Sequence, residues 1–193
     1  MVAALYVAKG GCYYGLPDVD PWDEERDARL YAGPHPVVAH PPCNRWSQLA
    51  RICEVRYGYK IGEDGGCFAS ALASVRSHCG VLEHPAETMA WPAHGLLAPN
   101  RSGGWQRGLD GGWTCQVSQV VYGHAAAKKT WLYYYGRSAP PSLNWRQPRG
   151  EFVVTTCSGE TRRGVREMPK RDRNVTPPAF RDLLLSIARS AAP

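Results

Sequence analysis

The feature that most constrains the fold of this chain is a short apolar run that stops at two prolines. The run 37–39 is followed by His40, Pro41, Pro42 and Cys43. Because proline has no N–H group to donate to a sheet, the strand must end there, and Cys43 falls on the loop just past its carboxyl end. Ligands of open α/β sheets bind outside the carboxyl ends of the strands. The run therefore predicts a buried strand that carries a cysteine to a ligand site.

Other apolar patterns predict strands and helices on both sides of this loop. No clear second strand is visible between Pro17 and Pro36, and 49–66 and 91–112 are expected to be loops. The expected elements are a first strand over 3–7, a helix marked by Phe68, Leu72, Val75 and Cys79, strands over 80–85, 114–121, 129–135 and 152–156, and a C-terminal amphipathic helix with Thr176 as its N-cap. This succession is typical of an α/β protein.

Size and composition favour a single domain in a reducing compartment. A chain of 193 residues, 44% of them hydrophobic, can bury one ordinary core. Seven cysteines without a Cys-x-x-Cys pair argue against a disulfide scaffold and against a zinc site. The sequence shows neither a signal peptide nor an apolar run of membrane-spanning length, so we expect a soluble cytoplasmic protein without a membrane partner. A net charge of +6 suits a nucleic-acid partner, although many basic proteins bind none.

Two residues are candidates for catalysis. Cys43 can act as a nucleophile if a nearby cation favours its thiolate, and Arg45 is two residues away. The alternative is a buried structural cysteine. Glu83 lies near the end of the strand over 80–85, at the same edge of the sheet as the loop that carries Cys43, where a carboxyl group can bond a ligand. The alternative for Glu83 is a solvated surface carboxylate.

A cofactor site is indicated near the start of the chain. Gly10 and Gly11 follow the first strand, and a glycine turn there lets the backbone approach a cofactor, although such a pair is often only a turn. Dinucleotide-type folds place an acidic residue near the end of the second strand to hold a ribose. Asp18 and Asp20 are the candidates for that role, and a solvated acidic loop is the alternative.

In this order the motifs resemble those of the cytosine-5 DNA methyltransferases. The stretch 41–47 is similar to the family's catalytic loop, with Asn44 where the family usually has Gln. The stretch 6–16 resembles its S-adenosylmethionine loop, with Ala8 in place of the first glycine. Glu83 resembles the acid of the family's Glu-Asn motif, with His84 in place of Asn. The stretch 174–178, Asn-Val-Thr-Pro-Pro, is similar to its closing motif.

The resemblance implies a compact, three-layer α/β fold of the Rossmann-like methyltransferase type. One domain would span 1–193, with 137–170 as a short basic insert where the family has a target-recognition domain. Cys43 would add to carbon 6 of a pyrimidine, Glu83 would activate the ring, and carbon 5 would take the methyl group of S-adenosylmethionine. Lys128 and Lys129 occupy the neighbourhood of an Arg-x-Arg motif that contacts the intermediate, and Lys129 is the catalytic candidate.

The remaining site residues implied by the resemblance fall into two groups. The cofactor would contact Tyr6, Gly10, Gly11, Asp20, Pro41 and Asn174. DNA, or a pyrimidine nucleotide, would contact Arg45, Ser47, Lys128, Arg162 and Arg163.

Three alternatives stay open at this point. A degenerate relative would bind nucleic acid without S-adenosylmethionine, and Ala8 and the invisible second strand favour it. A related enzyme would use the same thiol addition for different pyrimidine chemistry, or act on a free nucleotide, and the missing recognition domain favours that. In a structural protein the Pro-Pro-Cys sequence would be incidental, and a fully buried Cys43 would indicate this reading.

Overall fold

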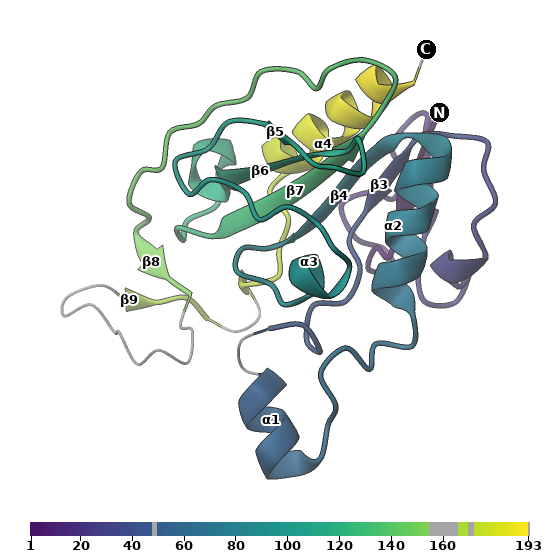
Figure 1. Cartoon of the computed structure of the whole chain (residues 1–193). Helices are drawn as coiled ribbons and strands as arrows, with labels where there is room; N and C mark the ends of the chain where they lie inside the picture. Colours follow the sequence, from purple (N-terminus) through teal and green to yellow (C-terminus); the bar gives the residue numbers. More distant parts are fainter. Residues whose placement is uncertain (48–49, 155–165, 170–171, 193) are drawn as a thin grey trace.

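A seven-stranded mixed sheet forms the centre of the protein. The computed structural model describes residues 1–47, 50–154, 166–169 and 172–192 (Figure 1). The strand order is β2-β1-β3-β4-β7-β6-β5. The strands are β1 (Val2–Leu5), β2 (Val19–Trp22), β3 (Val37–Ala39), β4 (Gly80–Pro85), β5 (Gln106–Arg107), β6 (Trp113–Ser118) and β7 (Lys129–Tyr135). The first four strands are parallel to one another, whereas β7, β6 and β5 continue the sheet in antiparallel fashion.

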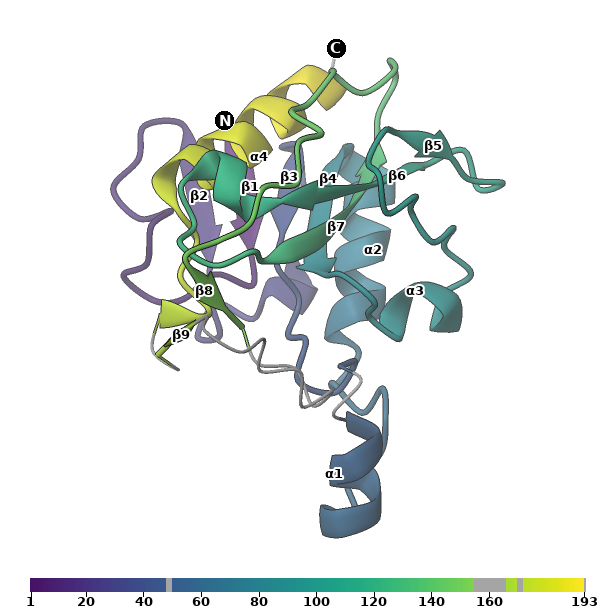
Figure 2. The same cartoon turned by 90° about the vertical axis from the view of Figure 1, so that its left-hand side faces the viewer.

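Helices cover both faces of the sheet, as an α/β fold requires. Helices α2 (Cys67–His78) and α3 (Ala90–Ala93) pack on one face, together with Leu5 and Leu82. Helix α4 (Pro178–Ala191) packs on the other face against β1, β3 and β4. Figures 1 and 2 show α4 and α2 on opposite sides of the strands. The expectation of an α/β protein with three layers is confirmed at this level.

The central strands form where the apolar runs are uninterrupted. All residues of β1 and β3 are buried, as is typical of parallel strands covered on both faces. β1 ends earlier than the predicted 3–7, because Tyr6 takes a left-handed conformation (φ 60°) that turns the chain out of the sheet. The helix expected from the spacing of Phe68, Leu72 and Val75 is confirmed as α2.

Several expectations for the polar segments were wrong. A second strand, β2, does exist, and Pro21 is accommodated because β2 lies at the edge of the sheet. The expected loop 49–66 contains helix α1 (Ala50–Tyr57), which stands away from the sheet (Figures 1 and 2). The expected loop 91–112 contains most of α3 and all of β5. Helix α4 begins at Pro178 with Pro177 rather than Thr176 as its N-cap residue.

The remaining elements are short. They are the 3-10 helices η1 (Ala28–Leu30) and η2 (Gln119–Tyr122) and the parallel pair β8 (Phe152–Val153) and β9 (Arg166–Glu167). η2 takes up the end of the strand expected over 114–121, and β8 is shorter than the strand expected over 152–156. Of the basic insert 137–170, the structure describes 137–154 and 166–169. None of the helices in the described residues is long and apolar enough to cross a membrane.

The topology places a switch point at the carboxyl ends of β1 and β3. From β1 the chain passes to β2 on one side, and it then returns to form β3 on the other side of β1. Such a switch point is where open α/β sheets bind ligands. The neighbouring strand β4 is pressed against β3 at its start, because a Cβ atom on Gly80 would lie 2.0 Å from the carbonyl oxygen of Val37. The register pairs Ala39 with Leu82, so the next residues, His40 and Glu83, lie side by side.

Candidate active site

A row of hydrogen-bonded side chains crosses the carboxyl ends of β3 and β4 on the face covered by α4. The Tyr13 hydroxyl lies 2.8 Å from Nε2 of His40, and Nδ1 of His40 lies 2.9 Å from Oε2 of Glu83. Nε2 of Gln119 donates to Thr130 at 2.8 Å and lies 3.5 Å from Oε1 of Glu83. The two Glu83 oxygens are therefore unequal: the imidazole holds Oε2 closely, and Oε1 has only a long contact with Gln119.

Glu83 is the ionised group at the centre of this row. Its side chain is 12% exposed, and burial acts to raise its pKa. The hydrogen bond from His40 and the charges of His40, Lys128 and His84 outweigh burial, so the pKa of Glu83 lies below its usual value. The carboxyl group therefore carries a negative charge at neutral pH. This excludes the interpretation of Glu83 as a solvated surface carboxylate.

The Cys43 thiol is half-buried and interacts electrostatically with the same groups. Burial raises its pKa above the usual value, and the negative charge of Glu83 raises it further, whereas Lys128 lowers it. The sequence suggested Arg45 as the cation that favours the thiolate, but the cation that acts on Cys43 is Lys128. In the substrate-free protein Cys43 is therefore a protonated thiol beside a carboxylate and an ammonium group. The half-burial of Cys43 does not support the reading of an incidental structural cysteine.

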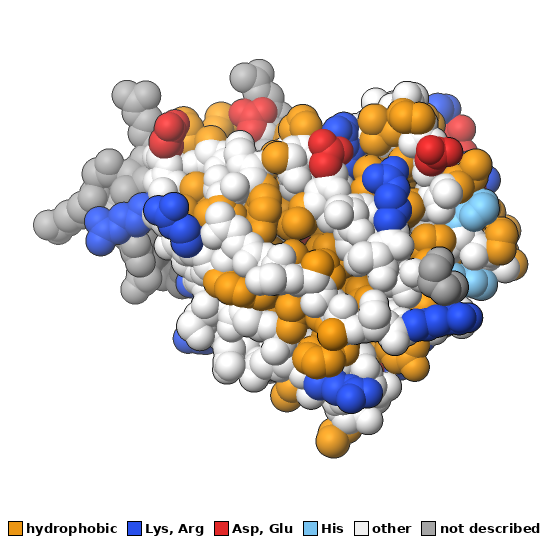
Figure 3. Space-filling view, turned by 90° about the horizontal axis from the view of Figure 1, so that it is seen from above, with side chains coloured by type: hydrophobic (Ala, Val, Ile, Leu, Met, Phe, Trp, Pro, Cys, Tyr) orange, Lys and Arg blue, Asp and Glu red, His pale blue; other side chains and the backbone are white. Residues whose placement is uncertain are grey.

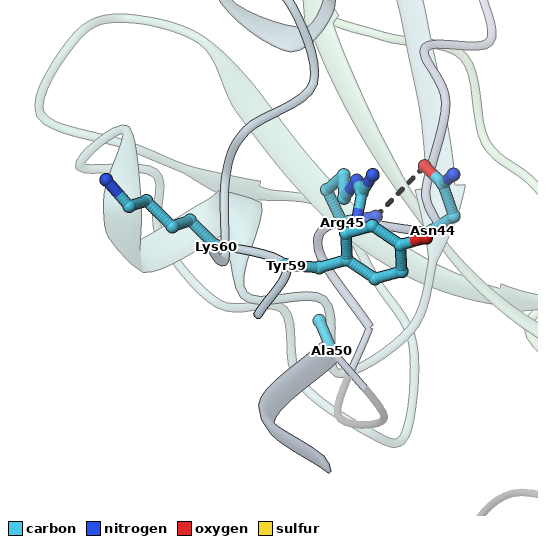
Figure 4. A pocket seen from close by; sticks show the side chains of 5 residues that line it. All are labelled: Asn44, Arg45, Ala50, Tyr59 and Lys60. Carbon is cyan, nitrogen blue, oxygen red and sulfur yellow. Dashed lines mark hydrogen bonds between the residues drawn. The ribbon is translucent and has the colours of Figure 1, made fainter. Parts of the chain in front are cut away.

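Arg45 lines a hollow on the loop beyond Cys43. Its guanidinium lies 4.0 Å from the ring centroid of Tyr59, within the range of a cation–π interaction. The hollow has a volume of about 280 Å³, and Figure 4 shows Tyr59 against Arg45 and Lys60 extending away from them. Its lining residues are Asn44, Arg45, Ala50, Tyr59 and Lys60. Ser47 lies near the start of α1, where its carbonyl accepts from the N–H of Ala50. Two cations therefore line the hollow, and its residues Asn44 and Arg45 directly follow Cys43 in the sequence.

The two lysines before and at the start of β7 differ in their surroundings. Lys128 is half-buried and acts on both Cys43 and Glu83. Lys129, the catalytic candidate from the sequence, is exposed on the first position of β7. The structure thus brings Lys128 to the site in the place that the sequence assigned to Lys129. Arg162 and Arg163, predicted to contact DNA, lie outside the described residues.

The acidic side chains of the predicted cofactor site are already bonded within the protein. Asp20 accepts from Nε1 of Trp22 at 2.7 Å and from Arg26 at 2.6 Å, and the Arg26 guanidinium lies 4.1 Å from the centroid of the Trp22 ring. Asp23, at the end of β2, is buried and bonded to the Tyr14 hydroxyl and two backbone N–H groups. Neither carboxylate is free to hold the ribose of a cofactor.

The other predicted cofactor residues lie in different environments. Tyr6 packs against the core on the α2 face. Gly10 takes a left-handed conformation, and a Cβ atom on Gly11 would lie 2.8 Å from the carbonyl oxygen of Ala8, so both glycines are required by the turn itself. Pro41 is buried, and Asn174 is exposed. In the conformation observed, each oxygen of Asp20 already accepts one hydrogen bond, so the ribose of S-adenosylmethionine would have to share or displace these partners.

Sequence reasoning missed four members of the site. Tyr13, His40, Gln119 and Thr130 surround Glu83, but only His40 has a local signal, its position between the apolar run and the two prolines. Among the described residues, no group of three or more His, Cys, Asp or Glu side chains could hold a metal ion.

Comparison with known proteins does not identify the chain. No protein-family model, no curated protein and no solved structure was found to match it. The argument for function therefore rests on the site.

Proposed function

We propose that the protein is a cytosine-5 DNA methyltransferase-like enzyme whose Cys43 thiolate adds to carbon 6 of a pyrimidine. The observation that carries the proposal is that Cys43, on the loop after β3, feels the charge of Glu83, on the adjacent parallel strand β4, while Lys128 acts on both groups. A nucleophile next to a carboxyl group that can bond the ring is the arrangement this addition needs. The target base would leave any duplex to reach the site.

The proposed step is balanced without a cofactor. The Cys43 thiol loses its proton, the sulfur–carbon 6 bond forms, and the carbon 5–carbon 6 π bond breaks as the ring nitrogen facing Glu83 takes up a proton. Carbon 5 then acts as a nucleophile and can accept a proton from water. The original carbon 5 hydrogen then leaves as a proton, and the ring nitrogen returns its proton to Glu83 as the sulfur–carbon 6 bond breaks and the carbon 5–carbon 6 double bond forms again. The released Cys43 thiolate takes a proton from solvent, and the aromatic ring is restored. The cycle exchanges the carbon 5 hydrogen with solvent.

The fold supports a compact Rossmann-like methyltransferase core. α4 follows the Asn-Val-Thr-Pro-Pro stretch and packs against β1, β3 and β4, as the resemblance implies for the closing helix. β2 is the one strand outside β1 in this sheet, as expected of an abbreviated first half. Both features agree with the proposed family.

The proposal is tested by hydrogen exchange at carbon 5. The full-length protein is incubated with [5-³H]-cytosine in duplex DNA, in single-stranded DNA and in deoxycytidine monophosphate, without any methyl donor. Release of tritium to water that requires Cys43 supports the proposal, and the substrate that reacts separates a DNA enzyme from a nucleotide enzyme. Absence of release from all three substrates across pH 5–9 would overturn it.

We expect Arg45→Ala to weaken binding of single-stranded DNA. Arg45 and Lys60 line the hollow beside Cys43, so a phosphate group seated there would release counterions. Loss of one such contact should reduce affinity several-fold and lower the slope of log affinity against log salt by about one. Fluorescence anisotropy at several salt concentrations measures both. Arg107→Ala is the control, because Arg107 also lies over an aromatic ring, that of Trp113, but on edge strand β5.

The described cations on the face seen from above do not gather in one patch. In this space-filling view the Lys and Arg side chains stand in separate groups with acidic and hydrophobic side chains between them (Figure 3). The hollow at Arg45 is therefore a better candidate for contact with a nucleic acid than this face.

A second candidate function is favoured by the bonds of Asp20. Because Arg26 and Trp22 occupy both carboxylate oxygens, a relative that adds the thiol without using S-adenosylmethionine fits the observed conformation. Such a protein would bind or modify a pyrimidine by other chemistry. The hydrogen exchange described above is common to both candidates, so a separate measurement must distinguish them.

We expect Arg26→Ala to bind S-adenosylhomocysteine more tightly than the wild type if the methyltransferase candidate is correct. The substitution frees one Asp20 oxygen and uncovers the Trp22 ring. A carboxylate that regains two ribose hydroxyl hydrogen bonds should gain about tenfold in affinity. Isothermal titration calorimetry of both proteins measures this, with Arg29→Ala as the control because Arg29 pairs with Asp27 instead. No heat for either protein would favour the second candidate.

A further inference from the structure

His40 and Tyr13 are not accounted for by the proposed thiol addition, yet they form the best-defined contacts of the site. Tyr13 comes from the loop after β1, His40 from the end of β3 and Glu83 from β4. Three separate segments thus converge on one carboxyl group. The His40 side chain is 14% exposed and the Tyr13 side chain is buried. Water therefore has little access to the two hydrogen bonds, which strengthens them.

The chemistry of the partners assigns the protons in this chain. Burial raises the pKa of Tyr13 well above its usual value, so its phenol keeps its proton. Glu83 is ionised and can only accept, so Nδ1 of His40 must be the donor to Oε2. When His40 is neutral, Nε2 is therefore an acceptor, and the Tyr13 hydroxyl donates to it. Both neighbours favour this one tautomer and one ring orientation.

We propose that Tyr13 and His40 are positioning residues that hold Glu83 in one orientation and control its protonation at the pyrimidine site. The imidazole binds Oε2, so Oε1 is left for the substrate. Addition of the thiol requires a proton at the ring nitrogen, and an isolated ionised Glu83 has none to give. A proton taken up from solvent at Oε1 can pass to the ring nitrogen, while the hydrogen bond from Nδ1 of His40 to Oε2 holds the carboxyl group in place. This inference rests on the proposed function and deepens it.

The other groups around Glu83 do not control its orientation and protonation in the way that His40 does. Lys128 and His84 lower the pKa of Glu83 by their charge after the larger influence of His40, and Cys43 faces it as the nucleophile. Gln119 is neutral and lies 3.5 Å from Oε1. Burial raises the pKa of Glu83, and His40 is the main group that lowers it. Without His40 the pKa of Glu83 should therefore rise, and the orientation of its carboxyl group should no longer be fixed.

The test compares His40→Ala, His40→Asn and Tyr13→Phe in the full-length protein. His40→Ala should lower the rate of tritium release about 10- to 100-fold, as loss of a residue that orients a functional group does, and it should move the midpoint of the pH–rate profile. His40→Asn places an amide donor near the Nδ1 position and should recover most of the rate. Tyr13→Phe should cause a smaller loss, because the donor to Glu83 remains.

A second measurement needs no substrate. Protein labelled with ¹³C at the glutamate carboxyl carbon is titrated by NMR, and the Glu83 signal is assigned from Glu83→Gln. The Glu83 midpoint should move to higher pH in His40→Ala and return toward the wild-type value in His40→Asn. Unchanged titration and unchanged exchange profiles would overturn the inference while the proposed function stands. Failure of the wild type to release tritium would overturn the proposed function, and the NMR titration would still decide whether His40 controls Glu83.

Discussion

Cys43→Ser should abolish the exchange of the carbon 5 hydrogen, with a loss of at least about a thousandfold. The hydroxyl of serine is a far weaker nucleophile than a thiolate, and no residue within the described row replaces it. The substitution exchanges one half-buried atom for a smaller one, so the far-ultraviolet circular dichroism spectrum and the thermal midpoint should be almost unchanged. The measurement is tritium release at saturating substrate.

Cys67→Ser is the matched control for this experiment. Cys67 is also half-buried and free, and it lies at the first position of α2. We expect its variant to exchange hydrogen at the wild-type rate. Equal activity of the wild type and Cys43→Ser would show that another group performs the addition, and the proposed function would then fail.

Glu83→Gln should lower the exchange rate by about 10²- to 10⁴-fold, the range observed when an acid or base catalyst is removed. Glutamine fills the same space but cannot pass a proton to the ring nitrogen. The same substitution should have the opposite effect on the thiol. Since the charge of Glu83 raises the pKa of Cys43, its removal should increase the fraction of thiolate and accelerate alkylation of Cys43 by iodoacetamide at pH 7.

Because Glu83→Gln should slow hydrogen exchange but accelerate alkylation, misfolding of the variant cannot easily produce the same result. A misfolded site would not give the combination of slower hydrogen exchange and faster alkylation of Cys43. Mass spectrometry of the peptide that contains Cys43 measures the alkylation rate. Glu87→Gln is the control, because Glu87 follows the same strand but pairs with Arg101 at the surface. Slower alkylation in Glu83→Gln would contradict the electrostatic link between the two residues.

The parts of the fold that the sequence predicted are those with strong apolar patterns. β3, β4, β7 and α2 are buried on the expected residues, and the positions of Cys43 and Glu83 at neighbouring strand ends follow from them. β2 was missed because Pro21 and Asp20 interrupt the apolar pattern of an edge strand whose residues are only half-buried. α1 was missed because its residues have almost no helical apolar stripe. Neither element therefore has the apolar pattern from which sequence analysis recognises strands and helices.

The sequence predicted Cys43 and Glu83 at the centre of the site, whereas the structure shows Glu83 within a network of hydrogen-bonded side chains. The bond between Tyr13 and His40 spans 27 positions, and that between His40 and Glu83 spans 43. No local pattern marks such contacts, because they depend on the register of parallel strands joined through long connections. Asp20 was identified by type, but its partners Arg26 and Trp22 determine whether it is available, and only the structure shows them.

The close contact between Gly80 and Val37 bears on the register of β4 against β3, and the register determines which side chain of β4 reaches the candidate site. Val81 faces α4 and Leu82 faces α2, so Glu83 faces the row with His40, and His84 points back toward Phe68 and Trp91. If β4 slid along β3 by one residue so that His84 took the place of Glu83, the two faces of the strand would exchange, and an imidazole would lie beside His40 where the carboxylate now lies. Gly80, three positions before Glu83, thus helps to set whether a carboxylate or an imidazole reaches the candidate site.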